Sequence, residues 1–182
     1  MHQWRRDEFP AGVRLLGTVA GSEPFNQDHA SEIKTVDAPT YLEQFVEPTI
    51  ADFEKYPYSR RHAFLACVVA FHTLDYLFPK EAVRRNGRKE FRKESDEFAI
   101  VDRVAHAFKH VESGTHKDQH NLPLSVKHVY SHPPARLGVL QCGASRLGDP
   151  TGKVALWGEE NSDLLPVLKE AGEFLRRKAR AV

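Results

Sequence analysis

Three residues that can act on a phosphate share one side of a predicted helix in the middle of the chain. Arg103, His106 and His110 are spaced three and four residues apart, so helical geometry aligns their side chains. Arginine can bind two phosphate oxygens at once, and histidine exchanges protons near neutral pH. These three residues are therefore the candidate catalytic groups of a phosphate site. The alternative is a solvated helix face, opposite a core-facing stripe of Glu97, Val101, Val104, Phe108 and Val111.

A second pair of polar residues lies in the most apolar segment of the chain, residues 63–78. His72 and Asp75 are three residues apart there, and isolated charges are costly in a core, so both side chains need partners. The carboxylate can orient an imidazole, either that of His72 or that of His106 or His110 on a neighbouring helix. We expect the pair to orient the site, and a polar network that fixes helix register is the alternative.

A basic run occupies residues 84–93, where six of the ten residues are Lys or Arg. Each such side chain can displace a counterion from a nucleic-acid backbone. The net charge of the whole chain is only +1, so the run is a local patch that acids elsewhere compensate, and a solvated basic connection is the alternative. The candidate phosphate-binding residues are Arg84, Arg85, Arg88, Lys89, Arg92 and Lys93.

Histidine is abundant, with ten in the chain and six of them between His106 and His132. Two pairs are spaced for metal binding, His116 with His120 and His128 with His132, since imidazole is a common zinc ligand. Their segment contains prolines, and no cysteine or carboxylate motif accompanies them. An H-E-x-x-H motif, a phosphate-binding P-loop and a G-x-S-x-G motif are also absent. We therefore expect no metal and no cofactor, and a His-ligated metal site remains an alternative.

The composition indicates one ordinary domain. The chain has 182 residues, of which 41% are hydrophobic and 28% charged, enough for a sizeable core. Two distant cysteines favour a reducing compartment. The N-terminus lacks the apolar run of a secretory signal, and residues 63–78 are shorter than the roughly 20 apolar residues of a membrane span. We expect a cytoplasmic protein that does not contact a membrane.

Apolar residues at helical spacing predict four helices. They begin at a Thr40–Glu43 capping box, at Ser59, at Ser95 and at residues 161–163. Pro48 predicts a kink or break near Glu47 in the first helix. The second ends at Phe78, and Gly114 closes the third after about Ser113. In the last helix, the predicted core residues are Leu164, Leu168, Ala171 and Leu175.

The remaining segments are predicted to be non-helical. Residues 80–94 form a basic connection with a turn at Asn86-Gly87. Residues 137–144 and 154–157 read as strands, and residues 126–130 as a third. The predicted fold is mainly α, a helical bundle with a small β-hairpin or meander inserted before the C-terminal helix. Its domains are an irregular arm over 1–38 and a single helical domain over 39–182, with the hairpin at about 126–158.

Residues 59–114 resemble a class of small uncharacterised bacterial helical proteins and, through them, the HEPN superfamily of compact helical bundles. The resemblance is carried by His72, Asp75 and Tyr76 on an apolar helix, by Lys109-His110 on a later helix, and by an arginine, Arg103, that precedes His110 by six intervening residues. It implies a metal-independent ribonuclease or an inactive RNA-binding relative, often a dimer. Arg103 would then stabilise charge on the scissile phosphate, and His110 would donate or accept a proton.

The function expected from the sequence is thus an RNA-binding or ribonucleolytic module, or one that binds another phosphate-bearing ligand, acting as a homodimer. Whether it is an enzyme stays open. A non-enzymatic helical domain that binds a protein or a small ligand is the second hypothesis, and the His-ligated metal site is the third.

Overall fold

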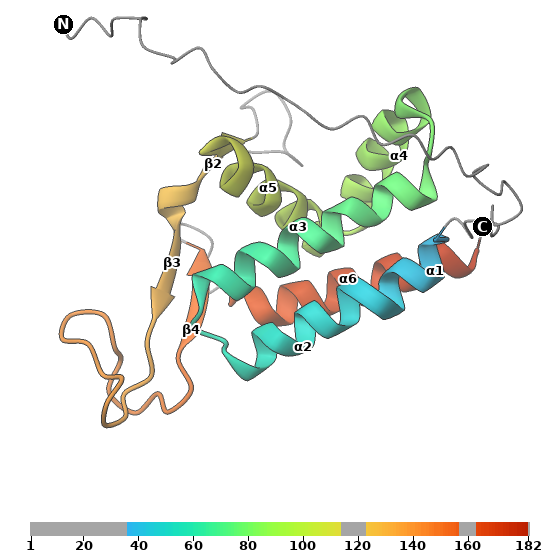
Figure 1. Ribbon diagram of the computed structural model, residues 1–182. Coiled ribbons are helices and arrows are strands. Elements are labelled where there is room, and N and C mark those ends of the chain that lie inside the picture. The colour runs from blue at the N-terminus through green and yellow to red at the C-terminus, as the bar shows by residue number, and fades with distance from the viewer. Residues whose placement is uncertain (1–35, 114–122, 157–162, 182) are drawn as a thin grey trace, which may run out of the picture. The chain divides into compact units, whose positions relative to one another are not determined.

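The computed structural model describes residues 36–113, 123–156 and 163–181, and these are mainly helical, as predicted (Figure 1). Short antiparallel strand pairs precede the last helix. The helices are α1 (Ala38–Tyr41), the π-helical η2 (Leu42–Val46), α2 (Glu47–Lys55), α3 (Arg60–Leu77), α4 (Glu81–Glu94), α5 (Asp96–His110), the 3-10 turn η4 (Val126–His128) and α6 (Leu164–Arg180). The strands are β1 (Glu112–Ser113), β2 (Leu124–Ser125), β3 (Val129–His132) and β4 (Lys153–Leu156).

The first three helices form one continuous helical run. Asp37 caps it, because its carboxylate accepts the Thr40 N–H at 2.8 Å, so the predicted start at Thr40 is three residues late. The predicted interruption near Glu47 takes the form of η2, in which the Glu47 N–H bonds to the Leu42 carbonyl five residues back. Pro48 follows directly and has no N–H to donate, which explains why the normal helical bonding changes there.

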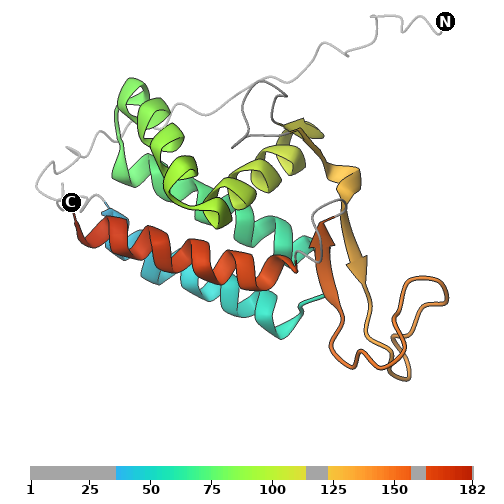
Figure 2. The same cartoon turned by 180° about the vertical axis from the view of Figure 1, so that it is seen from behind.

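Helix α3 is the centre of the bundle, as its apolar circumference predicted. Ser59 caps it through the His62 N–H, and it packs against α2, α5 and α6 (Figures 1 and 2). Small buried residues, among them Ala63, Ala66 and Ala70, let the neighbouring helices approach closely. Cys67 is fully buried on this helix, and its burial raises the pKa of the thiol.

Helices α5 and α6 complete the core. Ser95 caps α5 by accepting the Phe98 N–H at 3.1 Å, and Asp163 caps α6, both as predicted. The four core residues predicted for α6 are all 0% exposed. Helix α5 ends at His110, earlier than predicted, and Val111 then adopts a left-handed conformation with φ 71°. The predicted terminator, Gly114, lies outside the described residues.

The predicted basic connection over residues 80–94 is wrong, because these residues form helix α4. The predicted turn at Asn86-Gly87 lies inside it. Packing favours glycine there, since a Cβ at this position would overlap the Phe78 ring unless that ring moved. The Phe78 ring also contacts the Phe91 ring of α4, and the two ring centroids are 5.4 Å apart. A glycine that accommodates a close helix contact was therefore interpreted as part of a turn.

The small sheet differs from the predicted one in its strands. β3 pairs with β4 in antiparallel register, from Val129 opposite Leu156 to His132 opposite Lys153. β4 confirms the predicted strand at 154–157 as far as the described residues reach. The predicted strand at 137–144 is wrong, because that segment is a series of turns in which Gly138 has φ 84°. Of the predicted strand at 126–130, residues 126–128 form η4 and only 129–130 are extended. β1 pairs with β2.

Two further expectations bear on the described residues only in part. The predicted arm over 1–38 lies outside them except for residues 36–38, and Ala38 already belongs to α1. Within the described ranges, no helix is long and apolar enough to cross a membrane.

Replacing Gly87 with alanine should destabilise the protein, although alanine is the better helix former. The added methyl overpacks the contact with Phe78, which costs about 1–3 kcal/mol, and helix propensity returns about 1 kcal/mol. We expect a net loss of about 1 kcal/mol in urea unfolding. Asn86→Ala, at an exposed position of the same helix, is the control and should be neutral or slightly stabilising. Equal stabilisation by both changes would contradict the packing explanation.

Candidate functional site

A fully buried carboxylate, that of Asp102 on α5, organises the polar residues of the bundle. Its side chain is 0% exposed and faces two arginines of α4. Arg88 contacts both oxygens, with Nε 3.0 Å from Oδ2 and Nη2 2.9 Å from Oδ1. Arg92 adds its Nη1 at 3.4 Å from Oδ2. A carboxylate removed from water requires such counter-charges, and Arg88 supplies a hydrogen bond to Oδ2 and an ion-pair contact with Oδ1.

The imidazole of His106 lies against this ion pair. Its Nδ1 is 3.1 Å from the Asp102 carbonyl oxygen and 3.4 Å from Oδ1 of the same residue. Nη2 of Arg88 is 3.3 Å from the same ring nitrogen. Because Arg88 can only donate, its contact with Nδ1 is a hydrogen bond only in the tautomer that carries the proton on Nε2. In the other tautomer Nδ1 donates to the Asp102 carbonyl oxygen, and the lone pair on Nε2 can accept a proton.

The surroundings of His106 favour its neutral form. Burial lowers the pKa of the imidazole, and the neighbouring Arg88 cation lowers it further, against an opposing effect of Asp102. The side chains of His106 and Arg88 each remain 25% exposed. A molecule at the surface can therefore reach a neutral imidazole and a fixed cation side by side.

Two aromatic contacts extend this cluster. The His110 ring, exposed one turn further along α5, has its centroid 5.9 Å from that of His106. The Phe71 ring of α3 is nearly perpendicular to the His106 ring, with the ring centroids 4.8 Å apart. The guanidinium carbon of Arg88 lies over the Phe71 ring, 5.2 Å from its centroid. Helices α3, α4 and α5 together hold the set, which we name the α5 histidine cluster: Arg88, Asp102, His106 and His110, supported by Phe71.

The predicted pair His72 and Asp75 forms as a contact but not in the core. Nδ1 of His72 is 2.7 Å from Oδ2 of Asp75, and the two side chains are 41% and 39% exposed. Asp75 also pairs with Arg84 of α4. The predicted burial of the pair is therefore wrong, and Asp75 orients its own neighbour rather than His106. The ring centroids of Phe71 and His72 are 5.5 Å apart, so Phe71 lies next to both imidazoles.

Arg103 is buried, unlike the far end of the predicted helix face at His110. Its residue is 8% exposed and Ala99 is 5% exposed, whereas His110 is exposed. The predicted opposition of a polar and an apolar face on α5 is wrong, because α3, α4 and α6 cover most of the helix. Val101 and Val104 of the predicted stripe are 0% exposed, but Val111 is 58% exposed.

Most of the predicted basic patch is paired with acids of the same chain. Arg84 contacts Asp75, Arg85 contacts Glu81, Lys93 contacts Glu90, and Arg88 and Arg92 share Asp102. Lys89 is exposed. The structure thus brings Arg88 to the histidines and uses the other paired residues chiefly to neutralise local charge.

Asp102 was missed from the sequence. The available signal was its spacing, since Asp102 precedes His106 by four residues in the same predicted helix, which places the two side chains together.

The predicted histidine pairs do not form a metal site among the described residues. The Nδ1 of His128 accepts the Ser125 N–H at 3.4 Å, and the Nδ1 of His132 is 3.0 Å from the Ala144 carbonyl oxygen. His116 and His120 lie outside the described ranges. In the ranges that are described, no group of three His, Cys, Asp or Glu side chains is arranged to hold a metal ion.

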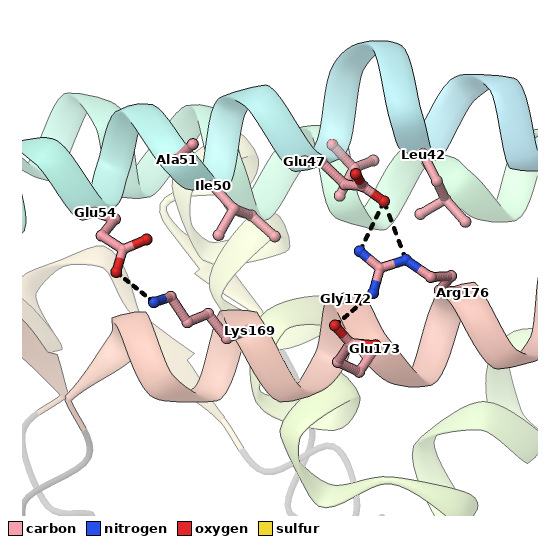
Figure 3. A pocket seen from close by; sticks show the side chains of 10 residues that line it. Leu42, Glu47, Ile50, Ala51, Glu54, Lys169, Gly172, Glu173 and Arg176 are labelled. Carbon is pink, nitrogen blue, oxygen red and sulfur yellow. Dashed lines mark hydrogen bonds and ion pairs between the residues drawn. The ribbon is translucent and has the colours of Figure 1, made fainter.

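A groove of about 270 Å³ lies elsewhere, between α2 and α6 (Figure 3). Ion pairs cross it, with Nη2 of Arg176 2.7 Å from Glu47 and Nζ of Lys169 2.5 Å from Glu54. None of the candidate residues predicted from the sequence lines it. Its apolar lining consists of Leu42, Val46, Ile50, Ala51 and Gly172.

Replacing Asp102 with asparagine should destabilise the protein strongly. The change removes the counter-charge of Arg88 and Arg92, and Arg92 has only 8% of its side chain exposed. Breaking a buried ion pair from one side costs about 3–5 kcal/mol, which urea unfolding would measure. Glu90→Gln, which breaks the exposed Glu90–Lys93 pair, should cost less than about 1 kcal/mol. Similar losses in the two variants would contradict the assigned role of Asp102.

The lowered pKa of His106 makes stability depend on pH with a definite sign. Below the unfolded value of 6.5 the unfolded chain binds a proton at this residue more readily than the folded chain, so acidification favours unfolding. Wild type should therefore lose stability relative to His106→Gln as pH falls from 8 to 5.5. The urea midpoints of both proteins across this range measure the difference in stability. The pH dependence contributed by the other histidines is the same in both proteins and cancels in this difference. A gap that is constant with pH would refute the assignment.

Comparison with known proteins identifies no relative of this chain. No protein-family model, no curated protein and no solved structure matches the chain.

Proposed function

We propose that the protein binds RNA and cleaves its phosphodiester bonds without a metal, at the α5 histidine cluster. The observation that carries the proposal is the buried Asp102 carboxylate, which holds the Arg88 guanidinium and the His106 imidazole 3.3 Å apart beside the exposed His110. Two imidazoles and a fixed cation are the groups that such a cleavage requires.

Each residue of the cluster has a distinct role in this proposal. His106, held neutral, takes the proton of the ribose 2′-hydroxyl, whose oxygen then attacks the phosphorus. The bond between phosphorus and the 5′-oxygen breaks, and protonated His110 donates a proton to that leaving oxygen. Arg88 still has Nη1 for a phosphate oxygen, since Nε and Nη2 contact Asp102. The products are a 2′,3′-cyclic phosphate and a 5′-hydroxyl.

This proposal keeps the RNA-directed chemistry implied by the HEPN resemblance but assigns the phosphate-binding arginine differently. Arg88 on α4, with a quarter of its side chain exposed, takes the place expected for Arg103, whose residue is 8% exposed. A homodimer, also implied by the resemblance, is part of the proposal, and light scattering of the full chain measures it.

A small-ligand-binding domain is the second candidate function. The groove between α2 and α6 favours it, because its apolar lining and crossing ion pairs offer both contact area and polar partners. A folded protein that is inert towards RNA would favour this candidate.

Cleavage of a labelled single-stranded RNA in excess chelator tests the leading proposal. His106→Gln and His110→Gln should each lower the rate about 10²–10⁴-fold, because each removes one proton transfer. Arg88→Lys keeps a charge beside Asp102 but loses the two-pronged contact, and it should lower the rate clearly more than Arg103→Lys. His128→Gln, an exposed histidine outside the cluster, is the control.

The identity of the product adds a second readout. A 2′,3′-cyclic phosphate terminus, detected by mass spectrometry, is expected. Neither binding nor cleavage of RNA at low salt, or activity that survives His106→Gln combined with His110→Gln, would overturn the proposal.

A further inference from the structure

The long connection between β3 and β4, residues 133–152, carries a feature unrelated to the histidine cluster. It extends from the hairpin away from the helices in both views (Figures 1 and 2). Two three-residue sequences in it are identical, Arg136-Leu137-Gly138 and Arg146-Leu147-Gly148. Because this connection lies outside the hydrophobic core, the repeated sequence suggests that the two copies adopt the same local structure.

The two sequences adopt the same turn. Gly138 and Gly148 both have φ 84°, a conformation that favours glycine. The N–H three residues after each arginine bonds to that arginine's carbonyl, from Val139 to Arg136 at 3.2 Å and from Asp149 to Arg146 at 3.1 Å. Such a turn, with glycine at its third position, presents the preceding leucine at its corner.

Both leucines are exposed to an unusual degree. Leu137 is 101% exposed and Leu147 is 92% exposed, and Leu140 between them is 48% exposed. A single exposed leucine needs no explanation, but two at equivalent corners of a repeated turn are held out by the same backbone geometry.

Hydrogen bonds at the base of the connection fix the positions of the two turns. The Ala135 N–H bonds to the Asp149 carbonyl at 2.7 Å and joins the residue before the first turn to the last residue of the second. The Asp149 carboxylate accepts the N–H groups of Thr151 at 3.0 Å and Gly152 at 2.8 Å, and these bonds lower its pKa. Asp149 is the one acid among residues 133–152, and these bonds commit it to the base.

We propose that this connection binds the surface of an anionic lipid bilayer. The proposal replaces the expectation from the sequence that the protein does not contact a membrane. Leu137 and Leu147 enter the interface between headgroups and acyl chains, and Arg136 and Arg146 bind lipid phosphates beside them. The charge argues for this occupant, since Leu137 and Leu147 each follow an exposed arginine. The form argues for it too, because separate leucines at turn corners can enter fluid lipid without the matched pockets that a folded partner would need. The inference is independent of the proposed ribonuclease.

The chain carries a reporter in the right place. Cys142, within this connection, is exposed, whereas the other cysteine of the chain, Cys67, is fully buried. An environment-sensitive thiol dye therefore labels Cys142 selectively in the folded, full-length protein. Its emission is followed during titration with vesicles of phosphatidylcholine alone and of phosphatidylcholine with phosphatidylglycerol.

The expected result is a blue shift with the anionic vesicles that weakens with salt, and little shift with phosphatidylcholine alone. Leu137→Ser with Leu147→Ser should lower the apparent affinity more than tenfold. Arg136→Gln and Arg146→Gln should each lower it about fivefold, equivalent to roughly 1 kcal/mol per arginine near a charged bilayer. The matched control is Arg61→Gln with Leu65→Ser, an arginine and a leucine exposed on α3, and it should bind like wild type.

Three outcomes would overturn the proposal. The first is the absence of a shift with every vesicle composition at low salt, and the second is a shift that the double leucine variant retains in full. The third is a shift produced by single-stranded RNA but not by vesicles, which would assign the connection to nucleic acid. Thermal unfolding of the variants checks that they fold, as expected for changes at exposed turn residues.

Discussion

The burial of one carboxylate governs the arrangement of the polar groups in this bundle. Asp102 is 0% exposed, so its charge must be balanced by groups that the fold itself supplies. Arg88 and Arg92 meet this requirement and tie α4 to α5. The same contact places Arg88 against His106. A stability requirement and a candidate catalytic geometry therefore share one set of atoms.

The docking of α4 depends on packing as well as on charge. Phe78 lies against the bare backbone of Gly87 and meets the Phe91 ring edge-on, which brings α4 close to the end of α3. Once α4 is in place, Arg84, Arg88 and Arg92 lie against acids of α3 and α5. Arg85 and Lys93 pair with acids of α4 itself. This explains how a run with six basic residues in ten contributes little free positive charge.

The chain separates two kinds of surface. The helical bundle holds the histidines through buried charges and rings, with Phe71 in contact with both His72 and His106. The connection between β3 and β4 instead relies on local turns that hold leucines out in solvent. Rigid support suits proton transfer, which requires fixed distances, and projecting turns suit contact with a deformable surface.

Local signals in the sequence determined the helix starts at Ser59, Ser95 and Asp163 and the buried stripe of α6, because caps and helical periodicity act over a few residues. The hairpin before α6 was also predictable, but the β3 partner of β4 was not, since pairing depends on distant residues. Only the tertiary structure decided that Gly87 lies in a helix and that Asp75 is exposed. It likewise decided that Asp102, rather than Asp75, supports His106. Each of these depends on which helices meet, and sequence spacing along a single helix does not specify that.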